Sequence, residues 1–211
     1  MAVKKRKVKN EESKKFSLNS LFYGNFRLAL NYLKESKNYV WISVLLFFII
    51  ALIGFILPVF FQEQITKIIQ DIIKQTEGLD TFNLIRFIFI NNLKSSGYAM
   101  FFGILFGIIP LGVVIVNGYI LGFIANKAIA AGGILVLWRL LPHGIFELPA
   151  VFISIGLGLK LGSFLFSYKK KDKFREFGKW LLNSLRVFVF IVIPLLILAA
   201  IIEGSLIIFF S

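Results

Sequence analysis

The stretch from Val40 to Phe61 is the feature that most limits what this chain can fold into. It runs for 22 residues without a charged side chain, and about 20 apolar residues suffice for one helix to cross the hydrocarbon core of a bilayer. The chain as a whole is 58% hydrophobic, and its uninterrupted apolar runs are longer than those that a soluble core uses. The sequence therefore predicts an integral membrane protein, with Val40–Phe61 as an uncleaved first span.

Four further apolar segments follow, which predicts an all-α polytopic bundle of about five spans, near 40–61, 98–116, 119–141, 144–166 and 181–202. Lys and Arg number ten in residues 1–38 and six in 167–180, whereas the four in 62–96 are balanced by four acids. Because basic loops stay in the cytoplasm, we expect a plasma-membrane protein with a cytoplasmic N-terminus and an extracytoplasmic C-terminus. The domain division is then 1–38 as a basic tail and 39–211 as the transmembrane domain.

Two segments outside the spans have amphipathic patterns. Within the outer segment 62–96, Ile65, Ile69 and Ile72 fall on one helical face, and a similar stripe precedes the first span on the cytoplasmic side. The basic N-terminus would favour anionic lipid headgroups. The net charge of +13 is explained by membrane topology, so we expect no nucleic-acid partner.

Polar residues inside predicted spans are functional hypotheses by default. His143 and Glu147 lie one turn apart beside Pro149, in "LLPHGIFELP" at 140–149, and Arg139 is close enough in sequence to pair with Glu147. A zinc site needs three or four ligands, and the chain has one His and no Cys. We therefore expect no metal, no cofactor and no catalytic residue, and interpret the motif as a polar group at the turn between the third and fourth spans.

The third span carries a second polar group, with Asn117, Gly118, Asn126 and Lys127 in or beside it. The turn between the second and third spans falls at Asn117-Gly118, which leaves little room for it, and "AAGG" at 130–133 favours an interruption of the third span. Counted from residue 119, Lys127 would lie about 12 Å inside the membrane. It would either face a polar cavity or bind backbone carbonyls, and both alternatives stay open.

The sequence "LLPHGIFELPAVFISIGLGLKLG" at 140–162 resembles the signature of the stage II sporulation protein M family, in which a polar motif opens a glycine-rich membrane helix. A second stretch, 87–122, resembles the family around its second span. The positions that carry the resemblance are Pro142, His143, Gly144, Glu147, Pro149, Ala150, Gly156, Gly158, Gly162, Asn91, Asn92, Asn117 and Gly118.

The resemblance implies a non-enzymatic membrane protein that anchors protein partners, since a member of the family in sporulating bacteria partners cell-wall hydrolases during engulfment. The partners here would contact the outer amphipathic segment or the basic cytoplasmic segments. The alternative is a small transporter, or a membrane subunit of one, with Lys127, His143 and Glu147 lining a path. The glycines of the fourth span would allow close helix approach within the bundle or to another chain, which leaves a homo-oligomer open.

Overall fold

The computed structural model describes residues 21–166 and 173–209, excluding the side chains of 138–143, 173 and 208–209. Every regular element in these residues is helical, which confirms the predicted all-α class. The elements are a helix over residues 21–35, α2 (Lys37–Ile56), α3 (Gln62–Thr76), α4 (Thr81–Phe101), η1 (Phe102–Ile104), α5 (Ile108–Gly132), η2 (Ile134–Leu140), α6 (Leu141–Ser163), η3 (Phe164–Phe166), α7 (Lys173–Val187), the π-helical segment η4 (Phe188–Val192) and α8 (Ile193–Phe209).

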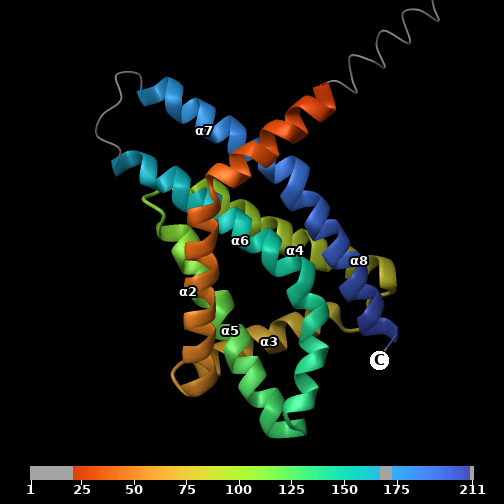
Figure 1. The fold of residues 1–211 in the computed structure, drawn as a ribbon. Coiled ribbons are helices and arrows are strands. Elements are labelled where there is room, and N and C mark those ends of the chain that lie inside the picture. The colour runs from red at the N-terminus through yellow and green to blue at the C-terminus, as the bar shows by residue number, and fades with distance from the viewer. Residues whose placement is uncertain (1–20, 167–172, 210–211) are drawn as a thin grey trace, which may run out of the picture.

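Figure 1 shows a bundle of long helices with a short helix across each end. At one end, the helix over residues 21–35 crosses α7, and toward the other end α3 lies across the bundle. Arg186 of α7 donates through Nε to Asn25 Oδ1 at 2.8 Å, which joins the two crossing helices directly. The two basic segments for which residues are described therefore lie at the same end of the bundle.

Helix α6 is the centre of the bundle. In its most apolar stretch of 18 residues, 72% of the residues are buried. The corresponding share is 17–33% for the other helices that are long and apolar enough to span a membrane. Its glycines face neighbouring backbones: a methyl group on Gly156 would lie 2.8 Å from Val40 Cα, and one on Gly162 would lie 2.5 Å from the carbonyl oxygen of Gly103. A methyl on Gly158 would overlap the carbonyl of Ala99. These glycines therefore serve packing within the chain.

Helices α2 and α5 run parallel and close together, again because glycines leave room. A methyl on Gly118 would lie 2.8 Å from the carbonyl oxygen of Phe47, and one on Gly122 would overlap the carbonyl of Ala51. The successive pairs are four residues apart on each helix, which is the spacing of one helical face. This close approach fixes α5 against the first span along most of its length.

The prediction of a turn at Asn117-Gly118 is wrong, because α5 continues through both residues from Ile108 to Gly132. Asn117 donates through Nδ2 to the carbonyl of Val113 at 2.8 Å, so its polar group is satisfied inside the helix. The chain instead reverses just before α5, where Gly107 has a φ of +74°, a left-handed conformation that suits glycine. The expected interruption at 132–133 is found, since α5 ends at Gly132 and Gly133 has a φ of +78°.

The helix before that reversal is α4, which lies deeper in the bundle than the predicted outer segment 62–96 would allow. Its beginning contacts the end of α8, where a methyl on Gly204 would lie 3.4 Å from Ile85 Cα. Its end contacts the beginning of the same helical run, with the rings of Phe101 and Phe188 6.1 Å apart. Thus α4 runs antiparallel to α8 and has a similar extent, although four other helices, and not α4, meet the length and apolarity of a membrane span among the described residues.

The predicted fifth span, 181–202, lies within one helical run, Phe174–Ile207, that is long and apolar enough to cross a membrane. Residues 181–187 belong to α7, in which polar and apolar residues occupy different faces. The run then passes through the π-helical turn at 188–192 into α8. Pro194 explains this turn, because it lacks the N–H that an α-helix would direct at the carbonyl of residue 190.

Candidate functional site

Glu147 lies in the second turn of α6 and is 6% exposed. The chain reaches it from the end of α5 through η2, and Pro149 lies two residues further inside the same helix. Gly144 is half-buried. The side chains of Arg139, Pro142 and His143 lie outside the described residues, so the predicted pairing of Glu147 with Arg139 or His143 stays a prediction.

Asn126 and Tyr119 of α5 satisfy carbonyls at the end of α2. Asn126 donates through Nδ2 to the carbonyl of Phe55 at 2.9 Å, and the Tyr119 hydroxyl donates to the carbonyl of Leu57. The last carbonyls of a helix have no partner in the helix itself. These two side chains therefore act as caps supplied by a neighbouring helix, which gives Asn126 a structural role that its sequence position did not indicate.

The expected depth of Lys127 needs correction, because α5 begins at Ile108 and not near residue 119. Lys127 is five residues from the end of the helix at Gly132, about 7.5 Å by helix rise. Its side chain is exposed, and the ammonium nitrogen lies 5.5 Å from the centroid of the Phe123 ring. A lysine stem covers such a distance to a helix end, so the expectation of a deeply placed lysine no longer follows from its position in the helix.

Lys160 forms a polar centre that the sequence did not reveal. It is 6% exposed, and its Nζ donates to Ser36 Oγ at 2.9 Å. The same nitrogen lies 3.7 Å from the centroid of the Tyr32 ring and 5.4 Å from that of Trp180. Lys160 therefore joins α6 to the helix over residues 21–35 and to α7. The signal available in the sequence was a lone cation in an apolar helix.

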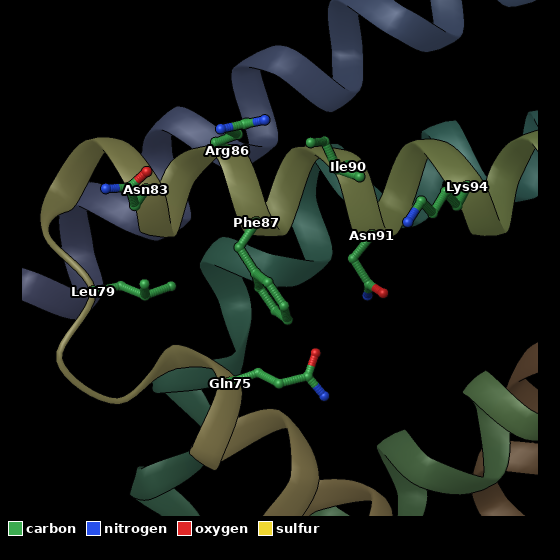
Figure 2. A pocket seen from close by; sticks show the side chains of 8 residues that line it. All are labelled: Gln75, Leu79, Asn83, Arg86, Phe87, Ile90, Asn91 and Lys94. Atoms are coloured by element: carbon green, nitrogen blue, oxygen red, sulfur yellow. The ribbon is translucent and has the colours of Figure 1, made fainter.

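One face of α4 carries a polar stripe that includes Asn91. With the end of α3, this face lines a pocket of about 370 Å³, shown in Figure 2. Phe87 and Asn91 project from α4 toward Gln75 of α3. Asn92, on the next helical position, is half-buried. The full lining is Gln75, Leu79, Asn83, Arg86, Phe87, Ile90, Asn91 and Lys94.

Arg86 and Lys94 of this pocket were counted in the sequence only as loop charges. The four polar residues of the stripe are separated by three, five and three positions: Asn83, Arg86, Asn91 and Lys94. This spacing keeps all four near one side of a helix. That spacing was the signal that could have identified the stripe. Among the described residues, no group of three His, Asp or Glu side chains could hold a metal ion.

These features define a class: a polytopic helical membrane protein whose buried polar groups lie at helix ends and helix junctions. The family described as stage II sporulation protein M matches residues 17–206, and the chain belongs to this family. It is also 31% identical over 137 residues to an uncharacterized protein of Methanocaldococcus jannaschii, a match that covers 64% of this chain and 60% of the relative. No solved structure matches the chain.

Proposed function

We propose that the protein is a non-enzymatic anchor in the plasma membrane, which holds partner proteins through its two cross-lying helical layers. The observation that carries the proposal is the closed packing of α6. Its glycines approach backbones of α2, α4 and the turn before α5, and Glu147 in the same helix is buried. A bundle packed at backbone distance supports a rigid platform better than a path for solutes.

The two pockets described in the structure bear on the transporter alternative. One lies between α3 and α4, and the other follows the polar face of α3. Neither is lined by Lys127 or Glu147, the residues that a transport path was expected to join. The transporter therefore stays the alternative that the flux experiment below tests.

The surface that α3 offers fits a partner-binding role. Ile65 is 4% exposed and packs against Tyr119 and Phe123 of α5, which holds α3 to the bundle. The opposite side of α3 lines a groove of about 540 Å³ with alternating charge, from Gln62, Glu63, Thr66, Lys67, Gln70, Asp71 and Lys74. We infer that partner proteins contact this face of α3, on the outer side of the membrane.

The proposed topology has five crossings, by α2, α4, α5, α6 and α8, with the N-terminus in the cytoplasm and the C-terminus outside. The common end of the helix over residues 21–35 and α7, joined by Arg186 and Asn25, supports this orientation because it gathers basic residues on one side. The overlap of α4 with α8 supports counting α4 as a crossing.

A site-specific photocrosslinker in native membranes tests the anchor. Placed at Gln70 on the polar face of α3, it should give adducts with a discrete partner protein. Placed at Leu52 of α2, which is 58% exposed on an apolar helix, it should give lipid adducts alone. Equal protein adducts from both positions would contradict a specific partner surface.

The same protein in liposomes tests the alternative. If wild-type protein dissipates a proton or solute gradient, and Glu147→Gln abolishes this flux while its melting temperature is unchanged, the protein is a transporter. The anchor proposal would then be withdrawn.

A further inference from the structure

The helix over residues 21–35 carries an exposed apolar stripe at the end of the bundle where it crosses α7. Phe22, Phe26 and Leu30 follow one another at intervals of four residues, which places them along one side of the helix, and all three are exposed. Ala29 of the same helix is buried in a core cluster with residues of α6. One side therefore holds the helix to the bundle, while the stripe lies outside that contact.

A ring contact shows which surface the stripe continues. The ring centroids of Phe22 and Phe190 lie 5.2 Å apart, and Phe190 belongs to the helical run Phe174–Ile207, which is long and apolar enough to cross a membrane. Val189, next to Phe190, is exposed. The stripe therefore joins the apolar surface of a helix that a bilayer would surround. Because the helix over residues 21–35 turns away from the direction of α2 (Figure 1), it would meet that bilayer at its surface.

Two cations extend the same surface. Lys34 follows Leu30 by four residues, which continues the row of the stripe. Arg27 directly follows Phe26, and both cations are exposed. They are seven residues apart, about 10.5 Å along the helix, so they would meet two different headgroups. The one acid of this helix, Glu35, is nine residues from Phe26, which places it half a turn away around the helix.

This pattern fits an anionic lipid leaflet. A helix that lies in the membrane interface buries aromatic and leucine side chains at the boundary of the acyl chains and directs Lys and Arg at the headgroups. A second copy of the chain fits less well. If two copies met stripe to stripe, the same cations would gather at the edges of the contact, and Glu35 would lie on the far side of each helix.

We propose that the helix over residues 21–35 lies in the leaflet interface at this end of the bundle and binds anionic phospholipid. The stripe contacts acyl chains, and Arg27 and Lys34 each contact a separate headgroup phosphate. In the proposed topology this is the cytoplasmic leaflet, and the polar side of the helix stays open to the cytoplasm. The inference needs Phe174–Ile207 to cross the membrane, and it holds for an anchor and for a transporter alike.

Electron paramagnetic resonance of the full chain in liposomes tests the position of the helix. The chain contains no cysteine, so a nitroxide label can be placed at Phe26→Cys on the stripe, or at Asn31→Cys, about 140° further round the helix. In liposomes of phosphatidylcholine and phosphatidylglycerol, oxygen dissolved in the acyl region should collide mainly with the label at residue 26. A neutral water-soluble nickel chelate should collide mainly with the label at residue 31. Both residues are exposed, so both labelled proteins should keep the wild-type melting temperature. Equal preferences at the two positions would overturn the interfacial placement.

The role of lipid charge is tested by varying the fraction of phosphatidylglycerol. Arg27→Gln/Lys34→Gln in the Phe26→Cys protein should lower the ratio of inserted to free helix by about 25-fold, because each basic residue near an anionic surface contributes about fivefold. The matched control, Lys67→Gln/Lys74→Gln, removes the same charge from α3. It should leave the ratio within about twofold, because α3 lies toward the other end of the bundle and exposed charges are screened beyond about 8 Å. An equal response of both double variants, or equal insertion in phosphatidylcholine alone, would overturn the role of the two cations.

Dilution separates the leaflet from a second copy of the chain. The preference of the label at residue 26 for oxygen should stay constant when the protein-to-lipid ratio falls by about tenfold, because insertion into a leaflet does not depend on protein concentration. Leu30→Cys should give the same result from the next turn of the stripe. If the shielding of both labels from the nickel chelate disappears on dilution, a second copy covers the stripe, and the proposal is overturned.

Discussion

Removing the hydroxyl group of Ser36 should destabilise the protein through Lys160. Ser36 is fully buried, and its Oγ accepts from Lys160 Nζ at 2.9 Å while donating to the carbonyl of Tyr32 at 2.7 Å. Ser36→Ala removes both hydrogen bonds, so the buried ammonium group loses its hydrogen-bond acceptor and keeps its contacts with the rings of Tyr32 and Trp180. The informative quantity is the coupling between this change and Lys160→Met, which keeps the unbranched stem and removes the charge.

The magnitude follows from the two hydrogen bonds. A bond to a charged group contributes about 1.5–3 kcal/mol and a neutral one about 0.5–1.5 kcal/mol, so Ser36→Ala alone should cost about 2–4.5 kcal/mol. In the Lys160→Met protein only the neutral bond remains, and the cost should fall to about 0.5–1.5 kcal/mol. The coupling energy should therefore be about 1.5–3 kcal/mol.

Lys160→Met by itself is a poorer test, because two large effects oppose each other. The ammonium group loses its hydrogen bond and a desolvated cation–π contact of about 2 kcal/mol. It also regains hydration that burial had removed, which is several kcal/mol for one ion. Their difference has no certain sign, whereas the coupling energy does.

Thermal unfolding of the four proteins in detergent measures the cycle, with about 2–4 °C expected for each kcal/mol in a chain of this length. The control cycle uses Ser43→Ala, because Ser43 Oγ is also buried but bonds only to the carbonyls of Val40 and Phe152. The coupling energy between Ser43→Ala and Lys160→Met should be smaller than about 0.5 kcal/mol. If the coupling energy between Ser36→Ala and Lys160→Met is equally small, Lys160 does not join the helices through Ser36.

Three other changes give direct readouts. Gly122→Ala should destabilise by at least about 1–3 kcal/mol, because the added methyl lies 2.7 Å from the nitrogen of Phe55 and nearer still to the Ala51 carbonyl; Gly112→Ala in the same helix, with open space around it, should not. Burial raises the pKa of Tyr32 to about 12, above its value near 10 in the unfolded chain, so stability is lost as the pH rises from about 10 to 12. Tyr32→Phe should reduce that loss in melts across this range. Glu147→Gln should lower the melting temperature by the equivalent of about 1–3 kcal/mol, and an unchanged value would contradict a structural role.

The apolar runs predicted α2 and α6 well, because hydrophobic length alone identifies a helix that crosses a bilayer. The predicted boundary between the second and third spans was wrong, because Asn117-Gly118 is a residue pair typical of turns but lies inside α5. The structure uses Gly118 for a different purpose, which is the close approach of α5 to Phe47. A contact between residues 71 positions apart is not visible in local sequence, so the misplaced boundary carried over into the depth assigned to Lys127.

The polar helix α4 escaped prediction for a related reason. Its hydropathy is lowered by Arg86 and Lys94, yet its other face packs on α8 through Leu84 and Ile88. Hydropathy averages the two faces, whereas packing depends on one. The candidate motif at 140–149 was recognisable because His143 and Glu147 interrupt apolar sequence, but its pairing depends on how η2 folds back, which sequence spacing does not determine.

The predicted orientation in the membrane depends less on these errors than the predicted span boundaries do. The turn predicted at residues 117–118 lies at 102–107 in the structure. The predicted second and third spans are therefore replaced by α4 and α5, and the proposed number of crossings stays at five. The structure supports the same parity independently: α2 and α5 are parallel through the pairs described, while α6 is antiparallel to α2, since Ser43 bonds to Phe152 and Tyr39 to Ser163. In the proposed topology four crossings, an even number, separate the helix over residues 21–35 from α7, which keeps both basic segments on one side of the membrane. In the proposed topology the polar stripe of α4 also crosses the membrane, so its charged side chains have to face the interior of the bundle or a water-filled cavity, or find polar partners.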